Sequence, residues 1–248
     1  MEINILHLIE GAKQARGLTV IIDVFRAFSL ECYLYDMGVR EIRPVGTVEE
    51  AFRLRNTLEN SVLIGERGGK KCEGFDFGNS PSSIPAAAVA GKTVIHTTSA
   101  GTQGVVNARG ASEIITGSLV NAKAVAAYLL RRNPETVSLV CMGNGGVRPA
   151  PEDELCAAYI QSLLEGRPLP DLQQQIAALQ TQGGRHFFDP AMQEIFPEAD
   201  FWLCTQYDRF PFVIRIEKDD MGWLAKKQHI EIPAENYSEV SCFTGSKA

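Results

Sequence analysis

Short runs of β-branched and apolar residues alternate along this chain with stretches whose apolar residues recur every three or four positions. The runs predict strands over 19–24, 41–45, 62–66, 93–98, 113–116 and 136–142. The periodic stretches between them predict helices over 27–37, 48–59 and 122–132. Strands that alternate with amphipathic helices build βαβ units, so the predicted fold class is α/β, a layered sheet flanked by helices.

The rest of the chain continues this pattern with fewer strands. A helix is predicted from 151 to about 165, a Gln-rich helical segment to 182, and a strand over 212–216. The 248 residues, 45% of them apolar, suffice for one large domain or two intimately joined subdomains. The last fifteen or so residues are expected to be poorly tied down.

Charge and cysteine usage exclude several classes of partner. The net charge is −6, and Lys and Arg adjoin only in pairs, so nucleic acid is not expected as a main partner. Charged residues interrupt the first twenty positions, and no later stretch is apolar enough to cross a membrane. The six cysteines are scattered along the chain and no two have CxxC spacing, which indicates reduced, structural thiols. We therefore predict a cytoplasmic protein with no membrane or nucleic-acid partner.

Polar residues follow the first and third predicted strands, where open α/β sheets bind ligands. Asp23 and Arg26 stand at the end of the strand 19–24, where a carboxylate holds a metal and a guanidinium grips phosphate. A plain ion pair at a helix start explains the same two residues. Glu66 and Arg67 lie in a Gly-rich turn that lets the backbone approach a ligand, or in a charged surface turn.

The loop 73–81 is too apolar for a solvated linker. Asp76 stands between Phe75 and Phe77, and its desolvation requires a metal, an arginine or backbone donors. Asn79 and Ser80 follow in the same loop as candidate ligand contacts.

Two further strand ends carry polar groups. Thr97, Thr98 and Ser99 precede a predicted helix and suit a phosphate, although ordinary helix capping accounts for such clusters as well. Glu152 and Asp153 open the helix that begins at 151, where acids also complement the helix dipole.

Two negative observations narrow the chemistry. Asp23 has no second acid two residues later, so direct attack by water is favoured over a covalent aspartyl route. The four histidines are not spaced as a metal pair, and His96 beside Thr97 is kept as a candidate proton donor.

These motifs together resemble the 2-phosphosulfolactate phosphatases. The most specific is Gly74-Phe75-Asp76-Phe77-Gly78-Asn79-Ser80-Pro81, and the ordered motifs extend from about 19 to 164. The resemblance implies an α/β fold of two similar, intimately associated subdomains, about 1–118 and 119–248. It also implies Mg²⁺-dependent hydrolysis of 2-phospho-3-sulfolactate to 3-sulfolactate and phosphate, a step towards coenzyme M.

The resemblance assigns roles to individual residues as expectations. The catalytic set is Asp23, Asp76, Glu152 and Asp153. The Mg²⁺ set is Asp23, Glu66, Asp76 and Asp153, and the substrate set is Arg26, Arg67, Asn79, Ser80, Thr97, Thr98 and Ser99. Ala100 and Phe28 depart from the family pattern, which leaves another phosphorylated 2-hydroxy acid open as the substrate.

Two other classes of protein share these features. One is a non-catalytic module that binds an anionic metabolite, and the other is a lyase or isomerase that stabilises an enolate with Mg²⁺. In each case the expected partner is a small phosphorylated organic acid, and a homodimer is the default assembly.

Overall fold

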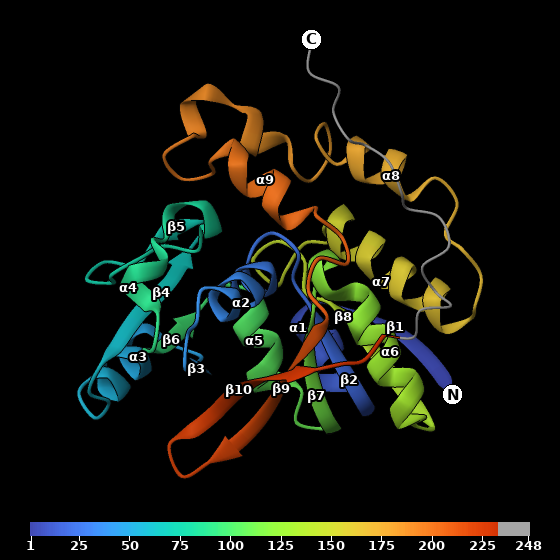
Figure 1. Ribbon diagram of the computed structural model, residues 1–248, viewed down its shortest axis with the longest axis horizontal. Helices are drawn as coiled ribbons and strands as arrows, with labels where there is room; N and C mark the ends of the chain where they lie inside the picture. The colour runs from blue at the N-terminus through green and yellow to red at the C-terminus, as the bar shows by residue number, and fades with distance from the viewer. Residues whose placement is uncertain (233–248) are drawn as a thin grey trace.

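One mixed β-sheet organises residues 1–232, the part of the chain that this computed structural model describes (Figure 1). Its strand order is β1-β8-β2-β7-β9-β10-β3-β6-β4-β5. The strands are β1 (Glu2–His7), β2 (Gly17–Ile22), β3 (Glu41–Pro44), β4 (Ser61–Arg67), β5 (Lys70–Lys71), β6 (Thr93–Thr97), β7 (Ala111–Gly117), β8 (Thr136–Cys141), β9 (Phe212–Asp219) and β10 (Gly222–His229).

Helices flank this sheet and connect its strands, as the alternating sequence pattern predicts. The α-helices are α1 (Leu8–Gln14), α2 (Ala27–Asp36), α3 (Val48–Arg55), α4 (Ala86–Val89), α5 (Gly101–Asn107), α6 (Ala122–Arg132), α7 (Pro151–Leu164), α8 (Leu172–Ala178) and α9 (Glu198–Cys204). Short 3₁₀ turns lie at Pro81–Ser83, Leu119–Asn121, Arg185–Phe188 and Pro190–Met192.

Two parallel sets of strands make up most of the sheet. In one set β8 lies between β1 and β2, and β2 also pairs with β7; in the other set β6 lies between β3 and β4. The antiparallel hairpin of β9 and β10 joins the two sets. Strand pairing therefore crosses the predicted subdomain boundary near residue 118, because β8 pairs with strands from the first half of the chain.

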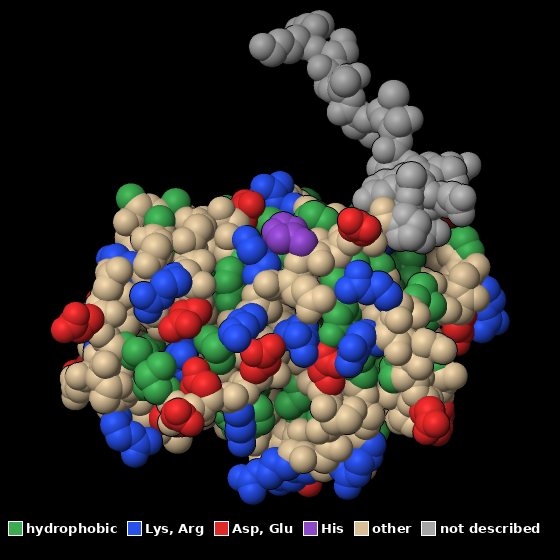
Figure 2. Space-filling view, turned by 60° about the horizontal axis from the view of Figure 1, so that its bottom comes forward, with side chains coloured by type: hydrophobic (Ala, Val, Ile, Leu, Met, Phe, Trp, Pro, Cys, Tyr) green, Lys and Arg blue, Asp and Glu red, His purple; other side chains and the backbone are tan. Residues whose placement is uncertain are grey.

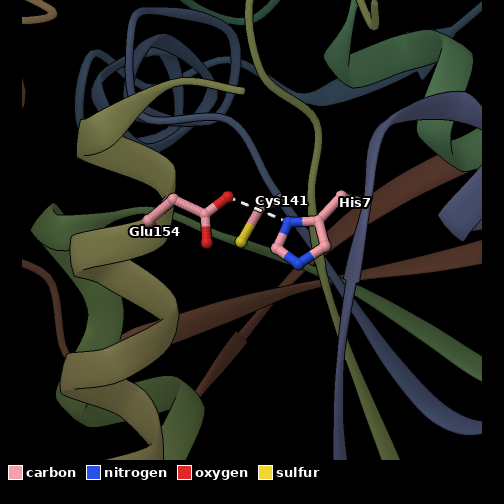
Figure 3. A group of neighbouring side chains, drawn as sticks. All are labelled: His7, Cys141 and Glu154. Atoms are coloured by element: carbon pink, nitrogen blue, oxygen red, sulfur yellow. Dashed lines mark hydrogen bonds and ion pairs between the residues drawn. The ribbon is translucent and has the colours of Figure 1, made fainter. Parts of the chain in front are cut away.

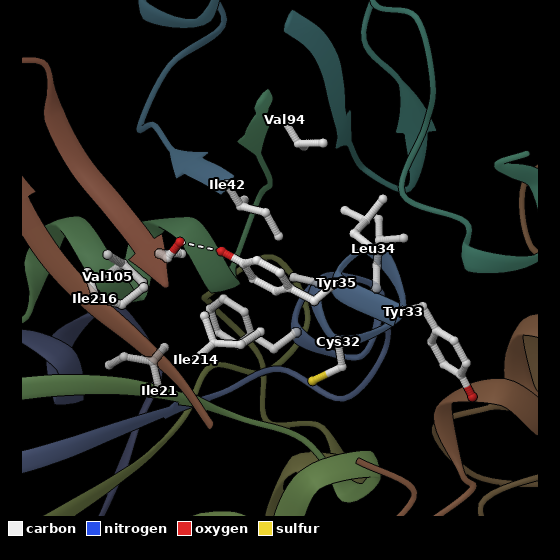
Figure 4. Packing of buried hydrophobic residues seen from close by; sticks show 14 of the residues in the cluster. Ile21, Cys32, Tyr33, Leu34, Tyr35, Ile42, Val94, Val105, Ile214 and Ile216 are labelled. Carbon is white, nitrogen blue, oxygen red and sulfur yellow. Dashed lines mark hydrogen bonds between the residues drawn. The ribbon is translucent and has the colours of Figure 1, made fainter. Parts of the chain in front are cut away.

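Side chains of β2 alternate between the two faces of the sheet, as a buried strand requires. Ile21 packs on one face with residues of α2, α5, β9 and β10, including Tyr35, whose hydroxyl donates to the carbonyl oxygen of Ala225 (Figure 4). Val20 and Ile22 pack on the other face with α6 and α7. Both faces of β2 are covered, so its end at Ile22 lies within the core and the position of the next residue, Asp23, is well fixed.

The predicted strands are confirmed, with ends that differ by at most three residues; the largest difference is at the end of β9. The strands β1, β5 and β10 were not predicted: β5 has two residues, and Lys226 and Lys227 interrupt the apolar pattern of β10. In β1, Ile3 and Ile5 alternate with Glu2 and Asn4, a signal that could have indicated this strand. Five of the cysteines are buried and unpaired; Cys242 and the predicted loose tail lie outside the described residues. No helix within residues 1–232 is both long and apolar enough to span a membrane.

The surface is of mixed charge where Figure 2 shows it. Lysine and arginine side chains alternate there with aspartate and glutamate, and the basic groups form no continuous stripe.

Candidate active site

A pocket of about 590 Å³ opens where four strands of the two parallel sets end. Asp23 follows β2, Gly143 follows β8, Glu66 lies near the end of β4, and Ser99 follows β6. The segment between α8 and α9, drawn in orange in Figure 1, lies above these strand ends and contributes Gly183, His186 and Phe196 to the lining. The carboxyl ends of the strands therefore meet in one crevice, as the fold class predicts.

Three buried carboxyl groups lie together on one wall of this pocket. Asp153 accepts hydrogen bonds from the backbone N–H groups of Val24 at 2.8 Å and Gly143 at 2.7 Å, so it joins the ends of β2 and β8. Asp23 accepts from the N–H of Ala27 at 3.1 Å. Glu152 is 6% exposed, and its Oε2 has no hydrogen-bond partner among the described residues.

Burial and mutual repulsion disfavour the ionised forms of these acids. Burial raises the pKa of Asp23 to about 6, and the charge of Glu66 adds to the rise. Burial raises the pKa of Glu152 to about 7, and the charge of Asp23 adds to it. Burial, Asp23 and Glu152 together raise the pKa of Asp153 well above its usual range. A cation placed among the three would reverse each of these shifts.

Glu66 ties together two loops that line the pocket. Its carboxylate accepts from the N–H of Gly69 and the N–H of Ser99, both at 2.6 Å, and from the Ser99 hydroxyl at 3.2 Å. The predicted role of Ser99 in donating to phosphate is thus weakened, because its N–H and its hydroxyl both already donate to Glu66. Glu66 therefore fixes the positions of Gly69 and Ser99 in the pocket lining.

Arg26 lines the pocket, but its amino groups are committed to the protein. Nη1 donates to Asp200 Oδ2 at 2.8 Å and to the carbonyl oxygen of Ile195 at 2.9 Å, and Nη2 donates to that of Gly69 at 3.3 Å. Asp200, which sequence reasoning missed, is fully buried and neutralises this arginine. The predicted grip of Arg26 on phosphate is weakened accordingly.

Asn79 lines the same pocket and contacts a buried histidine. Its Oδ1 lies 3.0 Å from Nε2 of His96, and Nδ1 of His96 lies 2.9 Å from Oε1 of Glu31. His96 is completely buried and does not line the pocket, so the structure places it where it does not reach a bound substrate. The hypothesis that His96 donates a proton to the substrate is wrong on this geometry.

Asp76 and Arg67 stand apart from the other predicted residues. Asp76 does not line the pocket; its Oδ2 accepts from Arg55 and from the N–H of Leu63 at 2.8 Å, which satisfies its charge. Arg67 donates to the Thr97 hydroxyl at 3.0 Å and lies in a separate shallow depression. The structure thus gives Asp76 a structural partner where the sequence suggested a metal.

Three predicted hydroxyl groups also have structural partners. Ser80 donates to Asp200 at 3.0 Å, and Thr97 accepts from Arg67. Thr98 Oγ1 accepts from the N–H of Thr102 at 3.1 Å in the first turn of α5, although the N-cap residue of this helix is Ala100. None of the three lines the pocket.

A small cluster outside the pocket fixes the beginning of α7 (Figure 3). His7 and Cys141 are register partners at the ends of β1 and β8, and His7 Nδ1 lies 2.9 Å from Glu154 Oε1. The three side chains point toward one another, within reach of a common metal ion. However, burial raises the pKa of the Cys141 thiol far above its usual range, and the thiol donates to the Asp153 carbonyl oxygen. We therefore assign the cluster to anchoring Asp153.

The segment between α8 and α9, called the lid segment below, brings aromatic rings over Arg26. Phe196 lies 4.8 Å from its guanidinium carbon, and His186 stacks between Phe187 and Phe196. Burial lowers the pKa of His186 to about 4, and the charge of Arg26 adds to the effect, so the imidazole is neutral near pH 7. These rings exclude water from one side of the pocket.

A pocket at the carboxyl ends of an α/β sheet, lined by buried acids whose pKa values are raised, has the features of an enzyme active site. The sequence model of the family described as "2-phosphosulpholactate phosphatase" matches residues 3–219. The chain belongs to this family.

Relatives named "Probable 2-phosphosulfolactate phosphatase" support the same assignment. The protein of Caldicellulosiruptor saccharolyticus is 43% identical over 149 residues, 58% of this chain and 61% of the relative. That of Carboxydothermus hydrogenoformans is 38% identical over 177 residues, 71% and 72% of the two chains. That of Bacillus subtilis is 29% identical over 204 residues, 82% and 88% of the two chains.

Proposed function

We propose that this protein is a Mg²⁺-dependent phosphatase that hydrolyses 2-phospho-3-sulfolactate to 3-sulfolactate and phosphate. The observation that carries the proposal is the charge of the pocket. Asp23, Glu66, Glu152 and Asp153 line it, and its lining arginine, Arg26, is already paired with Asp200. A multiply charged anion does not enter such a pocket unless a cation enters as well.

The residues present fit a hard divalent cation. Carboxylate oxygens are the ligands that Mg²⁺ prefers, and the backbone N–H groups already hold Asp23 and Asp153 in place. These two acids would hold the ion, which when bound neutralises the carboxylates and the phosphoryl group of the substrate. Glu66 accepts three hydrogen bonds from Gly69 and Ser99, one more than Asp153 accepts, so we leave it out of this set.

Glu152 is the group that accepts the proton of the attacking water in this proposal. Its Oε2 is buried and has no hydrogen-bond partner among residues 1–232, and it faces the pocket wall that Gly183 forms. The aromatic lid side of the pocket excludes bulk water, which strengthens the electrostatic contacts within it.

Phosphate release from a panel of phosphorylated 2-hydroxy acids, with 2-phosphosulfolactate among them, tests the proposal. We expect Mg²⁺-dependent release, and a kcat for Glu152→Gln that is about 100-fold or more below wild type. Release of phosphate from none of the panel by the folded protein would favour the binding-module alternative. A product that keeps its phosphate would favour the lyase or isomerase.

The same panel decides between the two substrate classes. Ala100 lines the pocket at a position where the family pattern has an amide side chain. If the missing amide changes specificity, a phosphorylated 2-hydroxy acid without a sulfonate is hydrolysed with the higher kcat/KM.

A further inference from the structure

A buried chain of three side chains leads from the interior to the pocket wall. Glu31 on α2 and His96 on β6 are both fully buried, and Asn79 is 5% exposed. The ring of His96 lies between the other two, 2.9 Å from Glu31 Oε1 and 3.0 Å from Asn79 Oδ1. Their separation in sequence, 65 and 17 residues from His96, shows that the fold assembles this chain.

The chemistry of the ends fixes where the protons lie. An amide oxygen only accepts, so Nε2 of His96 carries a hydrogen. On the other side, Glu31 and the ring share a proton, because Glu31 Oε2 has no partner among the described residues and a lone buried carboxylate is costly. In either arrangement of that proton, the ring donates to the oxygen of Asn79.

The opposite side of the Asn79 amide is then a donor without an acceptor. Nδ2 has no hydrogen-bond partner within residues 1–232, is not among the fully buried orphan atoms, and belongs to a residue that lines the pocket. Gly69 and Ser99, which also line the pocket, donate their N–H groups to Glu66, and Arg26 is paired with Asp200. The Asn79 amide is thus a free, fixed donor on this wall.

We propose that Asn79 Nδ2 binds an anionic oxygen of the substrate, and that Glu31 and His96 are positioning residues that hold the amide in this orientation. The inference rests on the proposed function for the identity of the substrate. The oxygen belongs either to the phosphoryl group or to the sulfonate, and both accept hydrogen bonds from an amide. A donor held rigidly by buried partners loses little entropy on binding.

The protonation pattern is tested without any turnover. The ¹⁵N chemical shifts of the His96 ring, assigned by their loss in His96→Gln, show whether Nε2 carries a hydrogen in the wild-type protein. We expect a protonated Nε2 and a shift of the Asn79 side-chain amide signals when inorganic phosphate or 3-sulfolactate is added in the presence of Mg²⁺, which the acidic pocket requires for an anion to enter. An unprotonated Nε2, or an amide that responds to neither anion, would overturn the proposal even if the phosphatase activity is established.

Steady-state kinetics with two substrates then identify which substrate group, phosphoryl or sulfonate, Asn79 binds. For Asn79→Ala we expect KM to rise about 10- to 100-fold with a smaller change in kcat, the loss of one hydrogen bond to a charged group. If Asn79 binds the sulfonate, KM rises for 2-phosphosulfolactate but not for phospholactate; if it binds the phosphoryl group, KM rises for both.

A matched pair of variants tests positioning by His96. His96→Gln keeps an N–H donor for Asn79, whereas His96→Leu does not. We therefore expect KM to rise in His96→Leu and to stay close to the wild-type value in His96→Gln. Equal KM values in these two folded variants would contradict the positioning role and leave His96 a packing residue.

Discussion

Replacing Asp200 by Asn removes the one counter-charge that the structure gives to a buried arginine. Asp200 is fully buried, and its Oδ2 accepts from Arg26 Nη1 at 2.8 Å. Its Oδ1 accepts from the Ser80 hydroxyl and the Ser82 N–H, both at 3.0 Å, and from the Ser82 hydroxyl at 2.6 Å. Asn keeps the shape of Asp200 but carries no charge and has only one acceptor oxygen. If that oxygen faces Ser80 and Ser82, the N–H₂ group faces Arg26; if it faces Arg26, it still does not neutralise the guanidinium.

The magnitude follows from burial. Arg26 is 3% exposed, so without Asp200 its charge stays in the interior, and breaking a buried pair in this way costs about 3–5 kcal/mol. For a chain of this length that corresponds to a fall in Tm of about 6 to 20 °C. The control is Asp189→Asn, an exposed capping residue of the same lid segment, for which we expect a change of a few tenths of a kcal/mol.

Urea-induced unfolding of the three proteins measures these free energies. We expect Asp200→Asn to lower the free energy of unfolding well below that of Asp189→Asn. A difference of less than about 1 kcal/mol between the two variants would refute the reasoning, since it would mean that Arg26 finds another partner or reaches solvent.

Three further predictions concern the acids. Asp76→Asn should leave the rate of phosphate release unchanged while Glu152→Gln abolishes it, because Asp76 pairs with Arg55 outside the pocket; equal losses would restore Asp76 to the site. In EDTA, Glu152→Gln should be more stable than wild type by about 1–3 kcal/mol above pH 7 and equally stable near pH 4. The folded state raises the pKa of Glu152 to about 7, so ionisation of Glu152 destabilises the folded wild-type protein as the pH rises. Urea unfolding measured against pH checks the sign. Gly183→Ala should lower kcat, because its Cβ would overlap Glu152 Oε2, whereas Gly46→Ala, with no contact closer than 3.8 Å, should not.

The sequence predicted the sheet and much of the pocket because both depend on local patterns. β-branched runs mark buried strands wherever they occur, and the carboxyl ends of parallel strands face the ligand in this fold class. Asp23, Glu66 and Asp153 were therefore found by their positions after strands. The same principle places Glu152, which begins α7 after β8.

The misassigned and missed residues depend on partners that are distant in sequence. Asp76 was expected to need a metal, an arginine or backbone donors, and the fold supplies the arginine and a backbone donor through Arg55 and Leu63. Asp200 and Glu31 meet their partners across 174 and 65 residues, and no periodicity or motif indicates such a pairing. Only the tertiary fold shows which buried charge neutralises which.

The measurement that tests the central claim most directly is phosphate release from 2-phosphosulfolactate by the purified protein with Mg²⁺ and with EDTA. The account predicts release with Mg²⁺ and its loss in EDTA, restored when Mg²⁺ is added back in excess. Release that is unchanged in EDTA would contradict the role of the carboxylate cluster in binding a cation. No release under either condition, from a protein shown to be folded, would contradict the phosphatase assignment for this substrate.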